Sequence, residues 1–325
     1  MPELPTGYEH DPNFSRGLAK VDLSEFGPVT HGKVRDICTL DDDRLIIATT
    51  DRVSAFDRIV GTIPGKGEVL NTLSAYWFEQ TAGIIPNHVL AVPHPNVLIA
   101  RRAETTLLVE VIVRRFMAKS STSTSVYDNY IGKGRRTIYG IEFPDGLAAN
   151  QELPMGTIIT PTTKAEEGHD LELTDEAAEH LVGEETWATV KQAALDLFER
   201  GRGVYGASGL LFVDTKYEFG RDKDGKLMLI DEVHTPDSSR LWLAATYDER
   251  FQSGQNPETF DKELLRRWLK ENGFTGEGDI PQIPTAIIDQ MADAYRVPYQ
   301  MLTGHELPPT DVSPDEIKRS IRAAL

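Results

Sequence analysis

Charged residues interrupt two apolar segments between residues 209 and 232. The first segment, GLLFVDTKYEFG, carries Asp214, Lys216 and Glu218, and the second, KLMLIDE, reaches Asp231. The intervening RDKDG is typical of a tight turn, so the two segments predict a β-hairpin. Alternate residues of a strand share a face, so the three charged residues of the first segment are expected on one side. With the turn centred near residues 223 and 224, Asp231 falls roughly opposite Glu218.

Two carboxylates that meet across a partly buried hairpin repel each other unless a cation lies between them. Mg²⁺ is commonly held by one or two carboxylates together with phosphate oxygens and water. Glu218 and Asp231 are therefore candidate magnesium ligands, and Lys216 could contact a phosphoryl group or a substrate carboxylate. A solvated hairpin face with cross-strand ion pairs is the alternative. The apolar flanks GLLFV and LMLI, and the polar DEVHTPDSSR that follows, favour a buried site.

Two further segments carry glycine beside basic residues, a combination that lets backbone and positive charge approach a phosphate together. HGKVRD contains Gly32, Lys33 and Arg35, although it does not match the P-loop pattern. IPGKGEVLN places Lys66 just before an expected helix, whose N-terminus would attract an anion. A plain turn and a flexible connector are the alternatives for these two segments.

Three other polar segments could border the same site. DRVSAFD offers Ser54 and Asp57 after an apolar strand, where both could equally form a turn. EVIVRRFMAKS leads a strand into Arg114, with a solvated strand end as the alternative. TPTTKAEEGHD contains Lys164 and His169, which could be a base, although a lone loop histidine is more often solvated.

Composition narrows the classes of partner. The 34 basic and 51 acidic residues give a net charge of −17, which disfavours nucleic acid and anionic membranes as partners. A small anionic substrate stays possible where local Arg and Lys override this charge. The single cysteine, Cys38, allows no intrachain disulfide and fits a reducing compartment. The start of the sequence does not resemble a signal peptide, and no apolar run reaches membrane-spanning length, so we expect a cytoplasmic protein.

The elements that would position these residues follow from periodicity. The N-terminal third is predicted to be β-rich, with strands over 28–40 and 43–50 joined at Asp41–Asp43. Helices are predicted over 67–83 and 184–201 because apolar residues recur there at helical spacing. Residues 119–172 read as long loops with one short helix near SVYDNYI.

Three helices are expected to close the chain, and we interpret them as structural. The first would begin at the cap Asn256 and end at Asn272-Gly273. The second covers PTAIIDQMADAYRV. The third starts at Ser313, which has capping-box spacing to Glu316.

Together these motifs resemble the SAICAR synthetase family, in the same order from about residue 29 to 250. The pair VDTKYEFG and DEVHTPDSSRLW carries most of the specificity. The resemblance implies an α/β (α+β) fold of two lobes, related to ATP-grasp enzymes and with a nucleotide cleft like that of protein kinases. The expected division is a β-rich nucleotide-binding lobe over residues 1–112 and a larger lobe over residues 113–325 with the metal and substrate sites.

The resemblance implies an ATP-dependent ligase of purine biosynthesis. ATP and Mg²⁺ would activate the carboxylate of the ribotide CAIR as an acyl phosphate, and the amine of L-aspartate would displace phosphate to give SAICAR and ADP. A small-molecule kinase with the same cleft and an inactive nucleotide-binding module are the alternatives. Retention of Glu218 and Asp231 beside Lys216 argues against the inactive module. We expect these small molecules as partners, no nucleic acid or membrane, and a monomer or small homo-oligomer.

Site residues carry over from the family position by position, with departures from its pattern at Leu108 and Lys119. By resemblance the metal ligands are Glu218 and Asp231, and the catalytic residues are Asp214, Lys216 and Arg240. The expected ATP contacts are Gly32, Lys33, Arg35, Lys66 and Glu110. The expected substrate contacts are Ser54, Asp57, Arg114, Ser120, Lys164, Asp237, Ser238, Ser239 and Arg250, the last of them on the ribotide phosphate.

Overall fold

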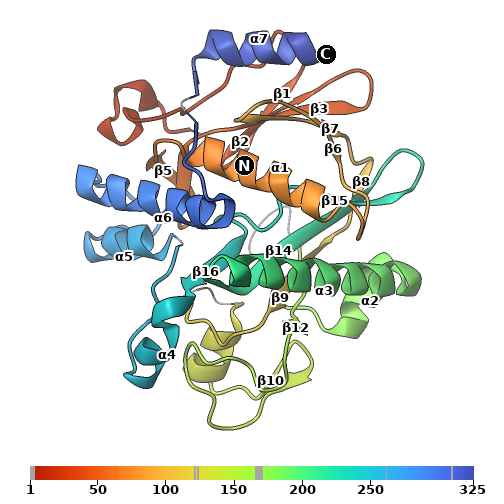
Figure 1. The fold of residues 1–325 in the computed structure, drawn as a ribbon, viewed down its shortest axis with the longest axis vertical. Helices are drawn as coiled ribbons and strands as arrows, with labels where there is room; N and C mark the ends of the chain where they lie inside the picture. Colours follow the sequence, from red (N-terminus) through yellow and green to blue (C-terminus); the bar gives the residue numbers. More distant parts are fainter. Residues whose placement is uncertain (1–3, 121, 123, 165–170, 261, 309) are drawn as a thin grey trace.

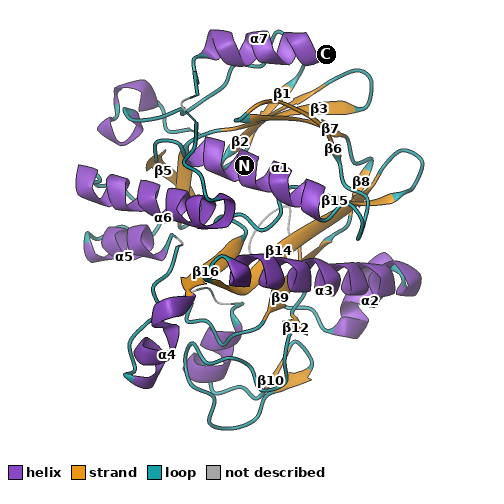
Figure 2. Ribbon diagram, viewed as in Figure 1, coloured by secondary structure: helices purple, strands orange, loops and turns teal. Residues whose placement is uncertain are grey.

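The computed structural model describes residues 4–120, 122, 124–164, 171–260, 262–308 and 310–325. Within them two large sheets and several helices form a mixed fold (Figures 1 and 2). The α+β class predicted from the sequence is therefore confirmed. Among these residues no helix is both long enough and apolar enough to cross a bilayer.

The N-terminal sheet has five strands in the order β1-β2-β3-β7-β6, all paired antiparallel. Its strands are β1 (Val29–His31), β2 (Arg35–Thr39), β3 (Arg44–Thr49), β6 (Val89–His94) and β7 (Val97–Arg101). The predicted β2–β3 hairpin is confirmed, whereas the predicted single strand over 28–40 is interrupted between β1 and β2. That interruption creates a turn over residues 32–34. Cys38 lies buried in this sheet.

The second sheet is built around β14 (Leu210–Arg221), a long strand that pairs on both edges. Because both of its edges are paired and its faces are covered, β14 is buried along most of its length. It pairs with four strands: β8 (Thr105–Thr106), β9 (Val109–Arg114), β15 (Leu227–Ile230) and β16 (Ser239–Leu243). Two short strands pair in turn with β9, namely β12 (Ile158–Ile159) and β13 (Thr162–Thr163). Two small hairpins lie apart: β4 (Arg52–Ala55) with β5 (Arg58–Thr62), and β10 (Thr137–Ile138) with β11 (Ile141–Glu142).

Helices cover these sheets and share one large core. They are α1 (Lys66–Gln80), α2 (Asp175–Val182), α3 (Glu184–Ala207), α4 (Ala244–Gln252), α5 (Glu263–Glu271), α6 (Thr285–Thr303) and α7 (Pro314–Ala324). Figure 1 shows α3 running across β14, and α1 beside α6 between the two sheets. Trp77 of α1, Trp187 of α3 and Leu269 of α5 are all buried in the same apolar cluster. This cluster fixes the helices against the sheet that carries the charged hairpin.

The structure differs from the predicted elements mainly near the C-terminus. The prediction that a helix begins at Asn256 is wrong, since α5 begins at Glu263. Residues 258–260 instead pair with β16, where Leu243 N–H donates to Glu258 O at 3.0 Å. Helices α2 and α4 were not predicted, whereas the short π-helical turn Asp128–Gly132 and the Ser313 cap of α7 are confirmed. The division at residue 112 stays a prediction, and that position lies within β9.

Candidate functional site

A cavity of about 320 Å³ opens beside β14, where β9, β16 and α5 converge. Among the described residues that line it, six are basic and three are acidic. They are Ile112, Arg114, Lys119, Ser120, Thr122, Asp214, Thr215, Lys216, Pro236, Asp237, Ser238, Ser239, Arg240, Lys262, Glu263 and Arg266. The lining reverses the sign of the whole chain, whose net charge is −17. The cavity is thus suited to anionic groups.

Strand register brings one group of these charges together. Asp214 of β14 lies opposite Arg114 of β9 and Arg240 of β16. Its carboxylate accepts from Arg114 Nη1 at 3.0 Å and lies 3.3 Å from Arg240 Nε. Arg114 also donates to Thr160 Oγ1 at 2.8 Å. The predicted residues Asp214, Arg114 and Arg240 therefore lie in one cluster.

Lys216, two residues along β14, is the centre of a second cluster. Its Nζ lies 2.8 Å from Glu110 Oε1 and 2.6 Å from Glu218 Oε1, and Lys164 pairs with the other oxygen of Glu218. Burial alone would lower the pKa of Lys216, but the carboxylates of Glu218, Asp231 and Glu110 outweigh it and raise that pKa. Burial likewise would raise the pKa of Glu218, but Lys216 and Lys164 hold it at about 2. Both groups are therefore ionised at neutral pH.

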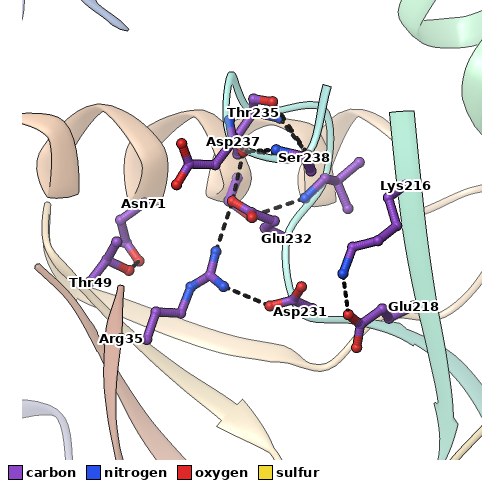
Figure 3. A network of polar contacts seen from close by, with 12 residues as sticks. Arg35, Thr49, Asn71, Lys216, Glu218, Asp231, Glu232, Thr235, Asp237 and Ser238 are labelled. Carbon is purple, nitrogen blue, oxygen red and sulfur yellow. Dashed lines mark hydrogen bonds and ion pairs between the residues drawn. The ribbon is translucent and has the colours of Figure 1, made fainter. Parts of the chain in front are cut away.

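Asp231 lies beside this cluster in an unexpected register. Glu218 pairs with Ile230, so the predicted pairing with Asp231 is off by one residue. The chain leaves β15 at Asp231, where φ is 68°, and the carboxylate accepts from Arg35 Nη1 at 2.6 Å (Figure 3). Burial raises the pKa of Asp231 to about 6 against the effect of Arg35, and the charges of Glu218 and Glu232 add to the rise.

This electrostatic arrangement fits a divalent cation. A raised pKa means that the charged form of Asp231 is disfavoured, and a nearby cation would reverse that. Among the described residues no group of three or more His, Cys, Asp or Glu side chains could hold a metal ion. Mg²⁺ at Glu218 and Asp231 would thus need phosphate oxygens and water as further ligands, which is its usual mode of binding.

The turn between β1 and β2 supplies Arg35 to the site. Its guanidinium bridges Asp231 and Glu232, with Nη2 2.8 Å from Glu232 Oε2. The turn is closed by Gly32 N–H, which donates to Arg35 O at 2.7 Å. Lys33 points elsewhere, to an exposed ion pair with Asp57 at 2.5 Å. Lys33, Asp57 and the partly buried Ser54 on β4 are not among the residues that line the cavity.

Lys66 is completely buried and lies behind the cavity wall. Its Nζ donates to Asp237 Oδ2 at 2.8 Å. Burial lowers the pKa of Lys66 to about 8, although Asp237 opposes the shift. The N-terminus of α1 already has an anion, because Gly67 N–H donates to Asp51 Oδ1 at 2.8 Å. The Gly-Lys-Gly segment is thus neither an open anion site nor a flexible connector in this structure.

Asp237 joins three parts of the chain at the cavity. Besides Lys66, its carboxylate lies 3.1 Å from Lys262 Nζ and accepts from Tyr295 Oη at 2.8 Å. Burial would raise the pKa of Asp237, but Lys262 and Lys66 outweigh it and lower that pKa strongly. Next to it, Ser239 Oγ lies 2.8 Å from Thr215 Oγ1, and Ser238 lines the same wall.

Sequence reasoning missed the contributions of the C-terminal helices. The interpretation of these helices as purely structural is wrong, because α5 lines the cavity and α6 supplies Tyr295. The available signal was the spacing of Lys262 and Arg266, which puts two basic side chains on one face of α5. Glu232 was also missed, although it directly follows a predicted metal ligand.

Arg250 is a further predicted substrate contact that does not line the cavity. This residue of α4 instead forms an ion pair with Glu258 at 2.9 Å. His169 lies outside the described residues. Ser120, by contrast, lines the cavity beside Lys119 as expected.

Comparison with known sequences identifies relatives over most of the chain. The family described as SAICAR synthetase matches residues 28–283. A phosphoribosylaminoimidazole-succinocarboxamide synthase of Legionella pneumophila (strain Lens) is 47% identical over 282 residues, which cover 86% of this chain and 88% of the relative. The enzyme of that name from Bacteroides fragilis is 39% identical over 320 residues, with coverages of 95% and 99%.

Solved structures give the same relationship. A SAICAR synthase from Saccharomyces cerevisiae complexed with SAICAR superimposes with a TM-score of 0.76 at 31% identity, covering 90% of this chain and all of the other. A SAICAR synthetase in complex with ADP gives a TM-score of 0.64 at 25% identity, covering 87% of this chain and all of the other.

Proposed function

We propose residue roles and a course of reaction for this chain, which belongs to the SAICAR synthetase family. It is an ATP-dependent carbon–nitrogen ligase of purine biosynthesis that joins L-aspartate to the carboxylate of CAIR, giving SAICAR, ADP and phosphate. A kinase or an inactive module is not favoured, because relatives matched over nearly their whole length carry the ligase name.

In this proposal the nucleotide lies against the β1–β2 turn and β14. Glu218 and Asp231 would hold Mg²⁺, which would supply charge neutralisation for phosphoryl transfer. Arg35 and Lys164 bind these two carboxylates, so both cations lie where they could also contact a phosphate group. Gly32, Lys33, Lys66 and Glu110 keep their predicted roles near ATP, and Lys66 would act through Asp237.

The substrates occupy the basic cavity. Arg114, Ser120, Ser238, Ser239 and Arg240 would contact CAIR and aspartate, because these side chains line it. Asp214 would orient Arg114 and Arg240, which it binds. Lys216 lies between the cavity and Glu218, so it is the residue placed to contact both the transferred phosphoryl group and the substrate carboxylate.

The reaction then needs positioning and charge more than covalent help from the protein. A carboxylate oxygen of CAIR attacks the γ-phosphorus of ATP and ADP leaves, which gives an acyl phosphate. The amine nitrogen of aspartate attacks the acyl carbon, phosphate leaves, and the nitrogen loses a proton. Lys216 and Arg240 would stabilise the negative charge that develops on the phosphoryl and acyl oxygens.

One observation carries these assignments: a net-positive cavity next to the carboxylates of Glu218 and Asp231, in a chain with strong negative charge. The test is ADP release by the purified protein with each substrate omitted in turn. We expect rapid release only with CAIR and L-aspartate together, and at most a slow leak without aspartate. Fast turnover without aspartate would indicate a kinase instead. Localisation in the cytoplasm, the small oligomer and the two-lobe division remain predictions.

A further inference from the structure

The loop between β15 and β16 has a buried histidine at its centre that the reaction described above does not use. His234 lies three residues after Asp231 and three before Asp237, and its side chain is completely buried. Its backbone φ is 55°, in the left-handed region that histidine adopts more often than most residues do. Burial lowers the pKa of His234 to about 3, so the ring is neutral at pH 7. Its contribution therefore comes from contacts and not from charge.

Two tyrosine hydroxyl groups bind this histidine from different elements. Tyr217 Oη, on β14, lies 2.5 Å from His234 Nε2. Tyr205 Oη of α3 donates to the carbonyl oxygen of His234 at 2.6 Å and accepts from Trp77 Nε1 of α1 at 3.1 Å. Tyr217 and Glu218 are neighbours in one strand, so their side chains point to opposite faces of the sheet. The loop is thus bound to β14 on the face opposite the proposed metal ligand.

A glycine within α3 makes room for the imidazole ring. A Cβ atom at Gly201 would lie 2.7 Å from Phe212 Cε1 and 2.8 Å from His234 Cε1, both closer than van der Waals contact. Glycine is less favourable than alanine inside a helix, so its place here has a packing reason. The rings of Trp77 and Phe212 lie around the imidazole, with centroids 4.6 and 4.8 Å from its own. The ring is therefore enclosed on several sides.

The imidazole is bound through one of its two nitrogens. His234 Nδ1 is buried and has no hydrogen-bond partner among the residues that the structure describes. An apolar side chain would fill this space without leaving a buried polar atom unpaired, so packing alone does not explain a histidine here. What the imidazole adds to an apolar side chain is the bond with Tyr217.

We propose that His234 and Tyr217 are positioning residues, which hold the β15–β16 loop so that the carboxylate of Asp231 stays beside that of Glu218. The two carboxylates repel each other, and Arg35 of the β1–β2 turn binds Asp231 from another direction. A buried anchor three residues along the chain keeps the loop backbone in place against these forces. The inference rests on the proposed Mg²⁺ site and gives that site a support on the buried face of β14.

Calorimetric titration with ADP, with and without Mg²⁺, tests this role independently of turnover. In Tyr217→Phe, the factor by which Mg²⁺ tightens ADP binding should fall roughly 3- to 10-fold, the loss typical of one hydrogen bond. The affinity for ADP without Mg²⁺ should stay within about twofold of the wild type, since the nucleotide itself does not touch the anchor. Tyr130→Phe is the matched control, because it removes a similarly buried hydroxyl group, which donates to Pro144 O at 2.6 Å in a separate apolar cluster.

Two further pairs of variants distinguish positioning from a general loss of packing. His234→Gln should keep more of the Mg²⁺ effect than His234→Asn, because the glutamine amide reaches about as far as Nε2 and the asparagine amide only as far as Nδ1. Gly201→Ala should weaken the Mg²⁺ effect by displacing the ring, although alanine favours a helix. Gly203→Ala, in the same helix but with open space around its Cβ, should not.

The outcomes separate this inference from the metal site on which it rests. A full Mg²⁺ effect in Tyr217→Phe and Gly201→Ala, or an equal loss in Tyr130→Phe, would overturn the positioning role and leave the metal site intact. A wild type whose affinity for ADP does not change with Mg²⁺ would refute the proposed metal site, and the positioning role with it.

Discussion

The two aspartates at either end of the β15–β16 loop occupy opposite electrostatic environments. Asp237 binds Lys66, Lys262 and Tyr295, and its pKa is lowered. Asp231 forms an ion pair with Arg35, and its pKa is raised to about 6 by burial and by the charges of Glu218 and Glu232.

The side chain of Asp237 is 5% exposed and that of Asp231 is 26% exposed, so burial alone would raise the pKa of Asp237 more. The pKa of Asp237 is nevertheless the lower one, so the cationic partners decide the difference. Asp237 is satisfied within the protein and connects α1, α5 and α6 to the cavity wall. Asp231 is left with excess negative charge around it, which a metal ion would neutralise. This comparison predicts a structural role for Asp237 and supports the proposed metal-binding role of Asp231.

The largest expected effect follows from Asp231→Asn. We expect turnover to fall by ~10³-fold or more, since the proposed metal ligand is removed, while the protein stays folded because local repulsion is relieved. ADP release and a thermal melt measure the two quantities. Asp224→Asn, in the exposed turn of the same hairpin, should leave both unchanged. Activity of Asp231→Asn within a few-fold of the wild type would remove this residue from the metal site.

Asp237→Asn should instead destabilise the fold. The change leaves the fully buried Lys66 without its carboxylate, at a cost of about 3–5 kcal/mol in the free energy of unfolding. Urea denaturation monitored by circular dichroism measures this cost. Glu152→Gln, which removes the exposed partner of Arg115, should cost less than about 1 kcal/mol. Equal costs for the two variants would contradict the structural role of Asp237.

The pH dependence of Mg²⁺ activation should follow Asp231. Below its pKa of about 6 the carboxyl group is protonated, so the Mg²⁺ concentration for half activation should rise about tenfold per pH unit. Mg²⁺ titrations between pH 5 and pH 8, roughly the range in which enzymes are stable, measure the effect. A flat dependence through pH 6 would show that Asp231 does not bind the metal.

In the absence of metal, Asp231 and Asp237 should make the free energy of unfolding depend on pH with opposite signs. The raised pKa of Asp231 means that the folded state holds its proton more tightly, so this stabilisation is complete below about pH 4 and is lost as pH rises through 6. The lowered pKa of Asp237 acts the other way, and its stabilisation is lost as pH falls below about 4. Thermal melts of the wild type and of each Asn variant at a series of pH values give, by difference, the pH dependence of stability due to each aspartate. Slopes of the same sign for Asp231 and Asp237 would refute the contrast between them.

The smallest effect is expected at Arg250, which lies outside both environments. Its ion pair with Glu258 is partly exposed, so Arg250→Gln should change stability by less than about 1 kcal/mol and the KM of CAIR by less than about twofold. Kinetics with varied CAIR provide the measurement. A large rise in that KM would restore the predicted contact of Arg250 with the ribotide phosphate and show that α4 moves on binding.

The sequence by itself determined the charged hairpin, the family and the ligase activity. Alternation along β14 and the turn at RDKDG are local properties of the sequence, so both can be predicted without knowledge of the fold. The one-residue error at Asp231 lies in the register of the whole hairpin, because Glu218 pairs with Ile230 and Arg221 with Leu227. The turn sets this register, and periodicity along a strand does not report it.

Only the tertiary structure decided which charges meet. Lys66 and Asp237 are 171 residues apart in sequence, and Arg35 and Asp231 are 196 apart, so packing of the helices and sheets creates both pairs. Likewise, α5 carries an ordinary amphipathic pattern, and its place at the cavity depends on the pairing of residues 258–260 with β16. Local sequence reports burial and turns, whereas the charge balance of a site depends on partners that the chain brings together only when folded.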